Sequence, residues 1–413
     1  METTYSVLSK DRYIIKNALL EIAFIADEAG IIGTQTDLFC IVIEAGKIAK
    51  VLPNNEELTD AIDAKGLLIL PAFKDMHVHL DKTLYGLPWQ ALSPSRKTVQ
   101  DMIAYEQEII PKLLKTSTHR AELLINLLQN YGTTFARTHF NVDNTSGLRS
   151  LENLQKALDN KKDSFKAELV AFPQHGLYYT DSASLMKEVA QLDSVDFIGG
   201  LDPFGIDNAI EKAVDFTVEL ALDNNKGIDI HLHDAGEEGI RTIEYLAEQV
   251  LLNTELKGRT FVSHAFALAH LQSQKLAKIA EKLAAAEVGI VSSIPFRSTV
   301  MPIPALLKYG VNVLVGNDNV QDYWSTFGSG NMLQKANLIA QLYGWVTEFE
   351  LSRSLRFATH NRLPLDDNGN RQWPKTGDEA ELVLIEADCS AEAVSRLSKI
   401  VAFMHEGNLY WKN

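Results

Sequence analysis

The sequence predicts an α/β protein built on a (β/α)8 TIM barrel, with a small β-sandwich formed by both ends of the chain. Two observations favour the barrel: eight short apolar segments follow one another along the chain, and amphipathic stretches lie between them. A third observation is that the two chain ends carry a different pattern, in which short strand-like pieces are separated by turn residues.

The eight apolar segments are the expected barrel strands. Parallel strands that are buried on both faces appear in a sequence as short, continuous apolar runs, often rich in β-branched residues. The stretches between them carry apolar residues at helical spacing, as crossover helices do. The expected strands cover residues 67–73, 134–138, 167–172, 196–201, 228–232, 260–265, 288–294 and 311–316, and clear helical stretches cover 118–131, 207–224, 236–252 and 267–287.

The two chain ends predict a second, discontinuous domain. Residues 38–44 and 47–51 read as strands, and so do 381–385, 400–404 and 409–411. The last two flank Glu406-Gly407-Asn408, which is typical of a hairpin turn. We therefore expect residues 1–66 and 366–413 to form a composite β-sandwich beside a barrel at residues 67–365.

Composition excludes several classes of function. The 413 residues include 39 Lys and Arg against 54 Asp and Glu, a net charge of −15, which argues against nucleic-acid binding. No apolar run approaches the ~18 residues of a membrane span, and charged residues such as Lys10 and Asp11 interrupt any secretory signal. Cys40 and Cys389 are too few for a disulfide framework. These features predict a cytoplasmic protein.

Histidines gather at the ends of the expected strands, where barrel enzymes carry their active sites. Six of the eleven histidines lie at the ends of strands one, two, five and six, and His175 follows strand three. The six are His77, His79, His139, His231, His233 and His264. Asp318 stands at the end of strand eight.

Four of these residues predict a metal site. His77 and His79 are two positions apart on a strand and therefore point to the same face. His231 adds a third imidazole, and Asp318 adds a carboxylate. This donor set suits Zn²⁺ or Fe²⁺ with an open position for water. The alternative is that the histidine pair is simply a polar stretch of loop.

The motifs around these residues resemble those of the amidohydrolase superfamily, and in particular its cytosine deaminase group. The resemblance runs in order from about residue 65 to 365. Its motifs are Pro71-Ala72-Phe73-Lys74-Asp75-Met76-His77-Val78-His79-Leu80-Asp81-Lys82, Arg137-Thr138-His139, Ala171-Phe172-Pro173-Gln174, Ile228-Asp229-Ile230-His231, Ser263-His264, Gly316-Asn317-Asp318, Trp324 and Gly330-Asn331-Met332.

The resemblance implies a barrel of the metal-dependent hydrolase type and assigns roles to its residues. Asp318 would be both ligand and base for a metal-activated water, and His264 would polarise that water or stabilise the tetrahedral centre. Binuclear relatives bridge two ions with a carboxylated lysine, usually at the end of strand four. Neither 172–174 nor 197–202 contains a lysine, so we expect one divalent ion.

The sequence departs from cytosine deaminases after strand five. Where they carry a glutamate that protonates the ring, this chain has Asp234, with His233 beside it. Cytosine deaminases also lack a lysine at the position of Lys82. The combination of Lys82 with His231-Leu232-His233 is more similar to the N-isopropylammelide amidohydrolase subgroup. That similarity implies catalytic roles for Lys82 and His233, and Asp234 is a candidate for acid catalysis at the position of the glutamate. The alternatives are that Lys82 is a solvated lysine on the surface and that Asp234 only orients a histidine.

Two further residues, Gln174 and Trp324, match positions that contact substrate in the family. Gln174 can recognise a ring N–C=O edge through one donor and one acceptor. Trp324 offers a flat apolar wall for a heteroaromatic ring, although it could also simply fill the core. Asn319, beside Asp318, is the third substrate-binding candidate. For His139 we expect a structural role, since the four-ligand set is complete without it.

The expected reaction is hydrolysis of a non-peptide C–N bond, by deamination or dealkylamination of a pyrimidine-, pterin- or triazine-like ring. The enzyme alternative is ring opening of the imidazolonepropionase or hydantoinase kind, and the non-enzyme alternative is a catalytically silent ligand-binding barrel. Specificity is expected to depend on loops 84–100, 175–185 and 294–310. We expect a small heterocyclic substrate as partner and, as relatives often do, assembly into a homo-oligomer.

Overall fold

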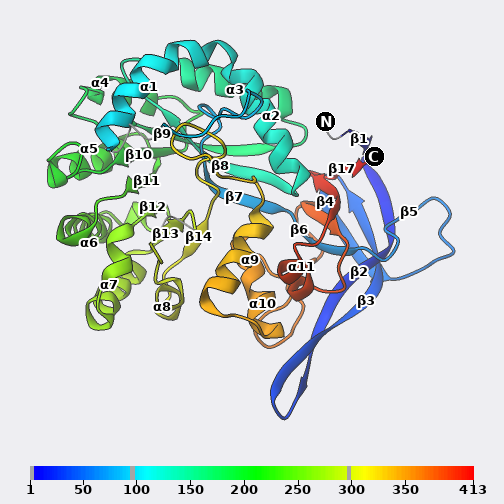
Figure 1. Ribbon diagram of the computed structural model, residues 1–413. Helices are drawn as coiled ribbons and strands as arrows, with labels where there is room; N and C mark the ends of the chain where they lie inside the picture. Colours follow the sequence, from blue (N-terminus) through cyan, green and yellow to red (C-terminus); the bar gives the residue numbers. More distant parts are fainter. Residues whose placement is uncertain (1–3, 94–97, 295–298) are drawn as a thin grey trace.

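The computed structural model describes residues 4–93, 98–294 and 299–413 and contains an eight-stranded parallel barrel sheet (Figure 1). Its strands pair in chain order, as successive βαβ units require. Seven of the eight predicted strands are confirmed within a few residues. The barrel strands are β7 (Phe73–Val78), β8 (Thr133–Asn141), β9 (Lys166–Phe172), β10 (Phe197–Leu201), β11 (Gly227–Leu232), β12 (Thr260–His264), β13 (Val288–Ser292) and β14 (Val313–Val315).

The predicted first strand, residues 67–73, is wrong. Its apolar core is β6 (Leu68–Pro71), which pairs antiparallel with β15 (Leu382–Ile385) in the other sheet. The barrel begins instead with β7, whose buried Asp75 made the segment look too polar for a core strand. Asp75 is tolerated there because it accepts hydrogen bonds from the backbone and side-chain nitrogens of Asn317, at 2.9 and 2.7 Å. The domain boundaries at residues 66 and 365 stay a prediction.

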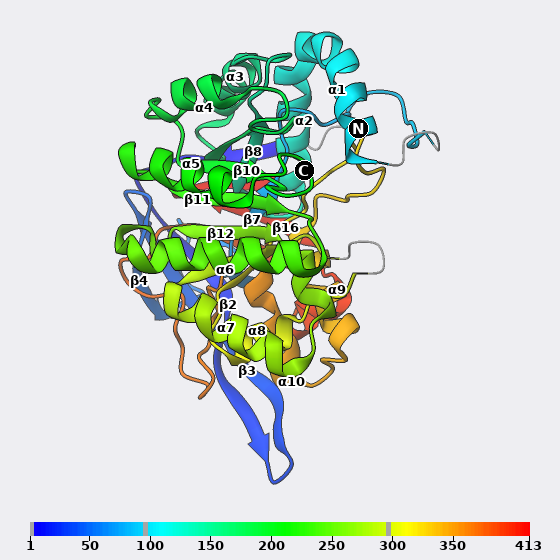
Figure 2. The ribbon, with the colours of Figure 1, turned by 90° about the vertical axis from the view of Figure 1, so that its left-hand side faces the viewer.

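Helices cover the outer face of the barrel (Figure 2). The four predicted helical stretches are confirmed, and the last is divided into a short 3₁₀ segment and α7. Within the described residues, no helix is both long enough and apolar enough to cross a membrane. The helices are α1 (Val99–Leu113), α2 (Ser117–Asn130), α3 (Arg149–Lys161), α4 (Ala183–Ala190), α5 (Ile210–Asp223), α6 (Gly236–Leu252), α7 (Ser273–Ala286), α8 (Ile303–Lys308), α9 (Met332–Tyr343), α10 (Glu348–Ser354) and α11 (Ser390–Arg396).

The two chain ends form one mixed nine-stranded sheet, which confirms the predicted composite β-structure. The ends meet because β1 pairs antiparallel with β17, and β16 and β17 form the predicted hairpin (Figure 1). The long β2–β3 hairpin projects from the body in both ribbon views (Figures 1 and 2). The remaining strands of this sheet are β1 (Tyr5–Leu8), β2 (Arg12–Asp27), β3 (Gly30–Glu44), β4 (Lys47–Pro53), β5 (Ile62–Asp63), β16 (Ile400–His405) and β17 (Asn408–Lys412).

The inside of the barrel is a packed core rather than a pore. An apolar cluster fills it, and the guanidinium of Arg137 lies 4.0 Å from the ring centre of Phe197 and 4.2 Å from that of Phe261. Because the barrel strands are parallel, the polar side chains at their carboxyl ends lie at one mouth. The cluster consists of Met76, Val170, Phe197, Phe261, Val291 and Leu314, with Phe135 packed against it.

The barrel closes between β7 and β14 through backbone contacts at the level of the histidine pair. The amide of Asp318 donates to the carbonyl of His77 at 2.6 Å, and the amide of His79 donates to the carbonyl of Asp318 at 3.2 Å. A Cβ on Gly316 would lie 2.4 Å from the backbone N and O of His77. The closing strands can therefore come this close only because residue 316 has no side chain.

We expect Gly316→Ala to lower the free energy of unfolding by about 1–3 kcal/mol or more, because backbone atoms of β7 would have to move. Urea unfolding measures the change. Gly33→Ala is the matched control, since its Cβ would make only ordinary contacts, the nearest at 3.7 Å. Equal unfolding midpoints for the two variants would contradict this description of the closure.

Candidate metal centre

The four predicted metal ligands come together at the barrel mouth. His77 lies on β7 and His79 directly after it, His231 lies on β11, and Asp318 follows β14 after Gly316 and Asn317. The Nε2 atoms of His77 and His79 are each 3.4 Å from Oδ1 of Asp318, and the Nε2 atoms of His79 and His231 are 3.4 Å apart. All four residues are at most 5% exposed. Ligand atoms of His77, His79 and Asp318 lie within 4.8 Å of one another, so one ion could contact these three side chains, and His231 lies directly beside His79.

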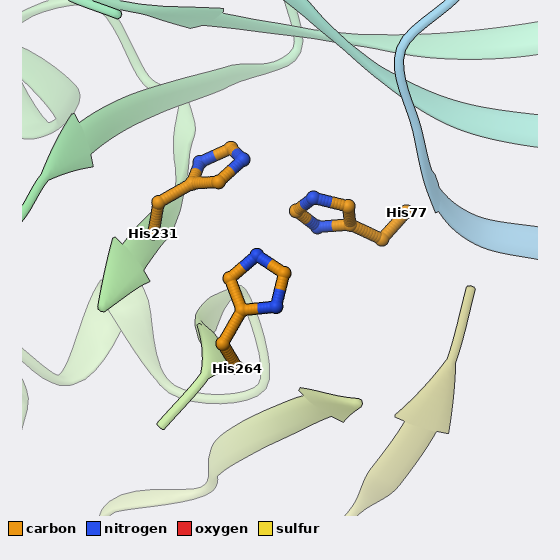
Figure 3. A group of neighbouring side chains, drawn as sticks. All are labelled: His77, His231 and His264. Carbon is orange, nitrogen blue, oxygen red and sulfur yellow. The ribbon is translucent and has the colours of Figure 1, made fainter. Parts of the chain in front are cut away.

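His264 faces the same space from the end of β12. Figure 3 shows its ring pointing toward those of His77 and His231, and ligand atoms of these three residues lie within 4.8 Å of one another. The chain turns sharply at this point, because His264 and Ala265 both have left-handed φ angles, of 71° and 49°. Nδ1 of His264 is 3.1 Å from Oγ of Ser293, which orients the ring.

Hydrogen bonds orient the ligand imidazoles from behind. Nδ1 of His79 donates to the carbonyl oxygen of His139 at 3.1 Å. Nδ1 of His77 lies 2.8 Å from Oγ of Ser263, whose hydroxyl donates to Asp229 at 2.6 Å. These contacts leave Nε2 of both rings facing the centre, as in many metal-binding histidines. Among the described residues, Nε2 of His77 has no hydrogen-bond partner.

The charge states of the cluster suit a cation. Burial lowers the pKa of His79 to about 3, with the nearby Lys82 adding to the effect, and burial likewise holds the pKa of His231 well below its usual value. Burial alone would raise the pKa of Asp318, but His264, His77 and His79 outweigh it and hold this pKa well below its usual range. Neutral imidazoles beside an ionised carboxylate form a donor set that fits a divalent ion.

His139 supports this cluster from below. Its ring is fully buried and its centre lies 4.0 Å from that of His77. Its Nε2 is 3.7 Å from Oδ2 of Asp229, and Nη1 of Arg137 lies 3.2 Å from the same oxygen. Ligand atoms of His139, His77 and Asp229 also lie within 4.8 Å of one another, so the structural role of His139 stays a prediction.

A second polar group lies beside the candidate metal centre and centres on Lys82. Its side chain is 4% exposed and donates to Oε1 of Gln174, so it is not a solvated surface lysine. Nζ of Lys82 also lies 3.7 Å from Oε1 of Glu106, which is fully buried on α1. The same carboxylate lies 2.7 Å from Nε2 of His175 and accepts the indole N–H of Trp324 at 2.6 Å.

The contacts of Glu106 bear on the roles that we predicted for Trp324 and Lys82. Trp324 is half-buried and hydrogen-bonded through its ring nitrogen, so it does more than fill the core. Lys82 lies 5.8 Å from the Trp324 ring centre. Asn319 is half-buried next to Asp318. We did not predict Glu106, although its helical spacing with the buried Ile103 and Ile110 placed it on the inward face of α1.

His233 and Asp234 follow β11, and their side chains have different partners. Nδ1 of His233 is 2.9 Å from Asp202, at the end of β10, and its ring stacks on His264 with centres 4.5 Å apart. Burial alone would lower the pKa of His233, but Asp202 outweighs it and raises this pKa. Asp234 points elsewhere: its carboxylate accepts the backbone N–H groups of Phe204 and Gly205 at 3.0–3.1 Å. The carboxylate that orients a histidine is Asp202, which we did not predict.

Two pockets open beside Asp322. Both are lined by Leu84 and Gln90, and one also by Tyr105 and Tyr323. Of the predicted specificity loops, residues 94–97 and 295–298 lie outside the described residues.

Comparisons with known proteins agree with this geometry. The model of a family described as the amidohydrolase family matches residues 60–402. The uncharacterized protein YahJ of Escherichia coli (strain K12) is 44% identical over 98% of this chain and 88% of its own length. N-isopropylammelide isopropyl amidohydrolase of Pseudomonas sp. (strain ADP) is 28% identical over 98% and 99%. The crystal structure of N-isopropylammelide isopropylaminohydrolase from Burkholderia multivorans ATCC 17616 superposes with a TM-score of 0.84 at 27% identity, covering 97% of this chain and 98% of that chain.

Proposed function

This chain belongs to the amidohydrolase family and is a hydrolase acting on C–N bonds, and from that premise we propose its reaction. We propose that it cleaves an exocyclic C–N bond of a small nitrogen heterocycle, releasing ammonia or an alkylamine. A pyrimidine-, pterin- or triazine-like ring is the proposed substrate. The relative that acts on N-isopropylammelide supports a triazine, since it covers almost the whole chain.

The convergence of His77, His79, His231 and Asp318 carries this proposal. These residues would hold one Zn²⁺ or Fe²⁺ ion, and a bound ion of this kind supplies the Lewis acid that activates water at neutral pH. A single ion is proposed because β9 and β10 are followed by Pro173-Gln174 and Asp202, with no lysine to bridge a pair.

Asp318 and His264 would carry out the chemistry. Asp318 is held ionised, so a carboxylate oxygen can take the proton of the attacking water and pass it to the leaving nitrogen. His264, oriented by Ser293, can stabilise the charge that develops on the oxygen bonded to the tetrahedral carbon. His233 is the proposed donor to the ring in place of the deaminase glutamate, because Asp202 holds it against His264.

Lys82, Gln174, Trp324 and Asn319 would bind the ring. Gln174 offers an amide donor and acceptor to a ring N–C=O edge, and Lys82 offers a charged donor to a ring oxygen. The indole of Trp324 provides a flat wall on which the ring can stack. The contact between Lys82 and Gln174 supports this arrangement, since both belong to one polar surface beside the metal ligands.

A substrate panel tests the proposed function. Purified enzyme is incubated with N-isopropylammelide, cytosine, pterin and creatinine, and the release of ammonia and isopropylamine is measured. We expect amine release from at least one of the first three rings. Formation of a new carboxylate without amine release would favour the ring-opening alternative, and complete inactivity of the metal-loaded enzyme would contradict the proposal.

We expect Ser263→Ala to weaken metal binding and kcat/KM on the order of 10- to 100-fold, the usual cost of losing a residue that orients a ligand. The hydroxyl is the link between His77 and Asp229, and both would lose a hydrogen bond in the buried site. Metal titration and initial rates measure the effect. Ser395→Ala, at an exposed position on α11, should change neither, and equal behaviour of both variants would contradict this role.

A further inference from the structure

We propose that Glu106 is a positioning residue that fixes Lys82 and Trp324 against the substrate ring and thereby sets the KM of the enzyme. This inference rests on the proposed function, because it concerns the substrate side of the same site. Glu106 comes from α1, outside the strand ends that carry the other site residues.

The geometry shows three side chains meeting at one carboxylate. Oε1 of Glu106 accepts the indole N–H of Trp324 at 2.6 Å and lies 3.7 Å from Nζ of Lys82, while Oε2 lies 2.7 Å from Nε2 of His175. Trp324 follows β14, Lys82 follows β7, and His175 follows β9. One side chain thus ties together residues that three separate strands deliver to the mouth.

The charge of Glu106 is needed at this position. Lys82 is 4% exposed, and a buried ammonium without a carboxylate partner is strongly disfavoured. Burial alone would raise the pKa of Glu106, but Lys82, His175 and Trp324 outweigh it and lower this pKa, so the carboxylate is ionised. The pair can present a proton donor to a ring oxygen without adding net charge, which suits a neutral heterocycle.

The packing of α1 holds Glu106 in place. One turn before it, Ile103 is buried in a cluster with Leu201 and Ile206, which belong to the end of β10 and the loop after it. The helix starts with a capping box between Thr98 and Asp101. A carboxylate on a helix fixed at both its start and its inner face has little freedom to follow a displaced partner.

Glu106→Gln keeps the size of the side chain and removes its charge. We expect KM for the best substrate of the panel to rise on the order of 10- to 100-fold, with kcat within about threefold and metal content unchanged. A merely structural role would act differently, because a misfolded fraction lowers apparent kcat and leaves KM unaltered. Glu108→Gln is the matched control, since Glu108 is exposed on the same helix and should change neither constant.

The indole NMR signal of Trp324 gives a second measurement that needs no substrate. In protein labelled with ¹⁵N-tryptophan, Trp324→Phe identifies the signal, which should move in Glu106→Gln and stay unchanged in Glu108→Gln. If Glu106→Gln does not fold, Glu106→Asp replaces it, since aspartate keeps the charge on a shorter side chain. This variant should also raise KM and move the Trp324 signal.

Two results would overturn the inference: a KM within twofold of wild type, whether or not kcat falls, or an unmoved Trp324 signal. If wild-type enzyme hydrolyses no ring of the panel, the proposed function fails by its own assay. The Trp324 signal then decides by itself whether Glu106 holds the tryptophan, so the two failures are distinguishable.

Discussion

Asp318→Asn should abolish turnover, with kcat/KM falling at least on the order of 10³-fold, while the fold is retained. Oδ1 of Asp318 lies 3.4 Å from Nε2 of both His77 and His79, and the substitution removes the negative charge of this carboxylate. It therefore removes a negatively charged ligand atom and the proposed base in one step. The amide has nearly the same shape, so the backbone contacts between Asp318 and β7 can persist.

Steady-state kinetics and thermal unfolding of the two proteins measure these effects. Asp159→Asn, at an exposed position on α3, makes the same chemical change far from the mouth and should behave as wild type. Turnover of Asp318→Asn close to that of wild type would refute the role of Asp318 as base, whatever the result for metal binding.

His79→Ala should reduce activity by at least about 100-fold, more than the loss of a residue that only orients a ligand. Nε2 of His79 lies 3.4 Å from both Asp318 and His231, so its removal opens a gap in the middle of the ligand set. The variant should also retain less metal after dialysis. Activity assays and metal titration measure both consequences.

His405→Ala is the matched control for His79→Ala. His405 is also buried, but it pairs with Glu381 in the terminal sheet, at 2.9 Å. Its loss should lower stability and leave metal content and kcat/KM of the folded enzyme unchanged. Chelation of the wild-type protein should reproduce the His79→Ala phenotype, and added Zn²⁺ or Fe²⁺ should restore activity. Full activity after complete chelation would contradict the metal mechanism.

Much of the fold could be predicted because the signals were local. Buried parallel strands such as β11 and β12 are short and mostly apolar, and each carries a mouth-facing histidine at its last or second-last position. The first barrel strand was misplaced because two buried strands, β6 and β7, are separated only by Ala72. The more apolar of them belongs to the terminal sheet, and hydrophobicity alone cannot say which sheet a strand joins.

The candidate site was predictable where its residues follow strands. His77, His79, His231 and Asp318 meet because strand ends share one edge of the barrel. Glu106 belongs to a helix that we had not predicted, and its spacing with Ile103 and Ile110 indicates an inward position only once that helix is known. The partner of His233 is Asp202, from a neighbouring strand, and a contact between distant segments is set only by tertiary packing.

The metal content of protein purified without chelators tests the central claim most directly. We predict one equivalent of Zn, Fe or Mn per wild-type chain, and well below one in the folded His77→Ala/His79→Ala double variant. Elemental analysis of both proteins, together with unfolding curves, gives the answer. Wild-type protein that carries no stoichiometric metal, yet hydrolyses its substrate at full rate, would contradict the account.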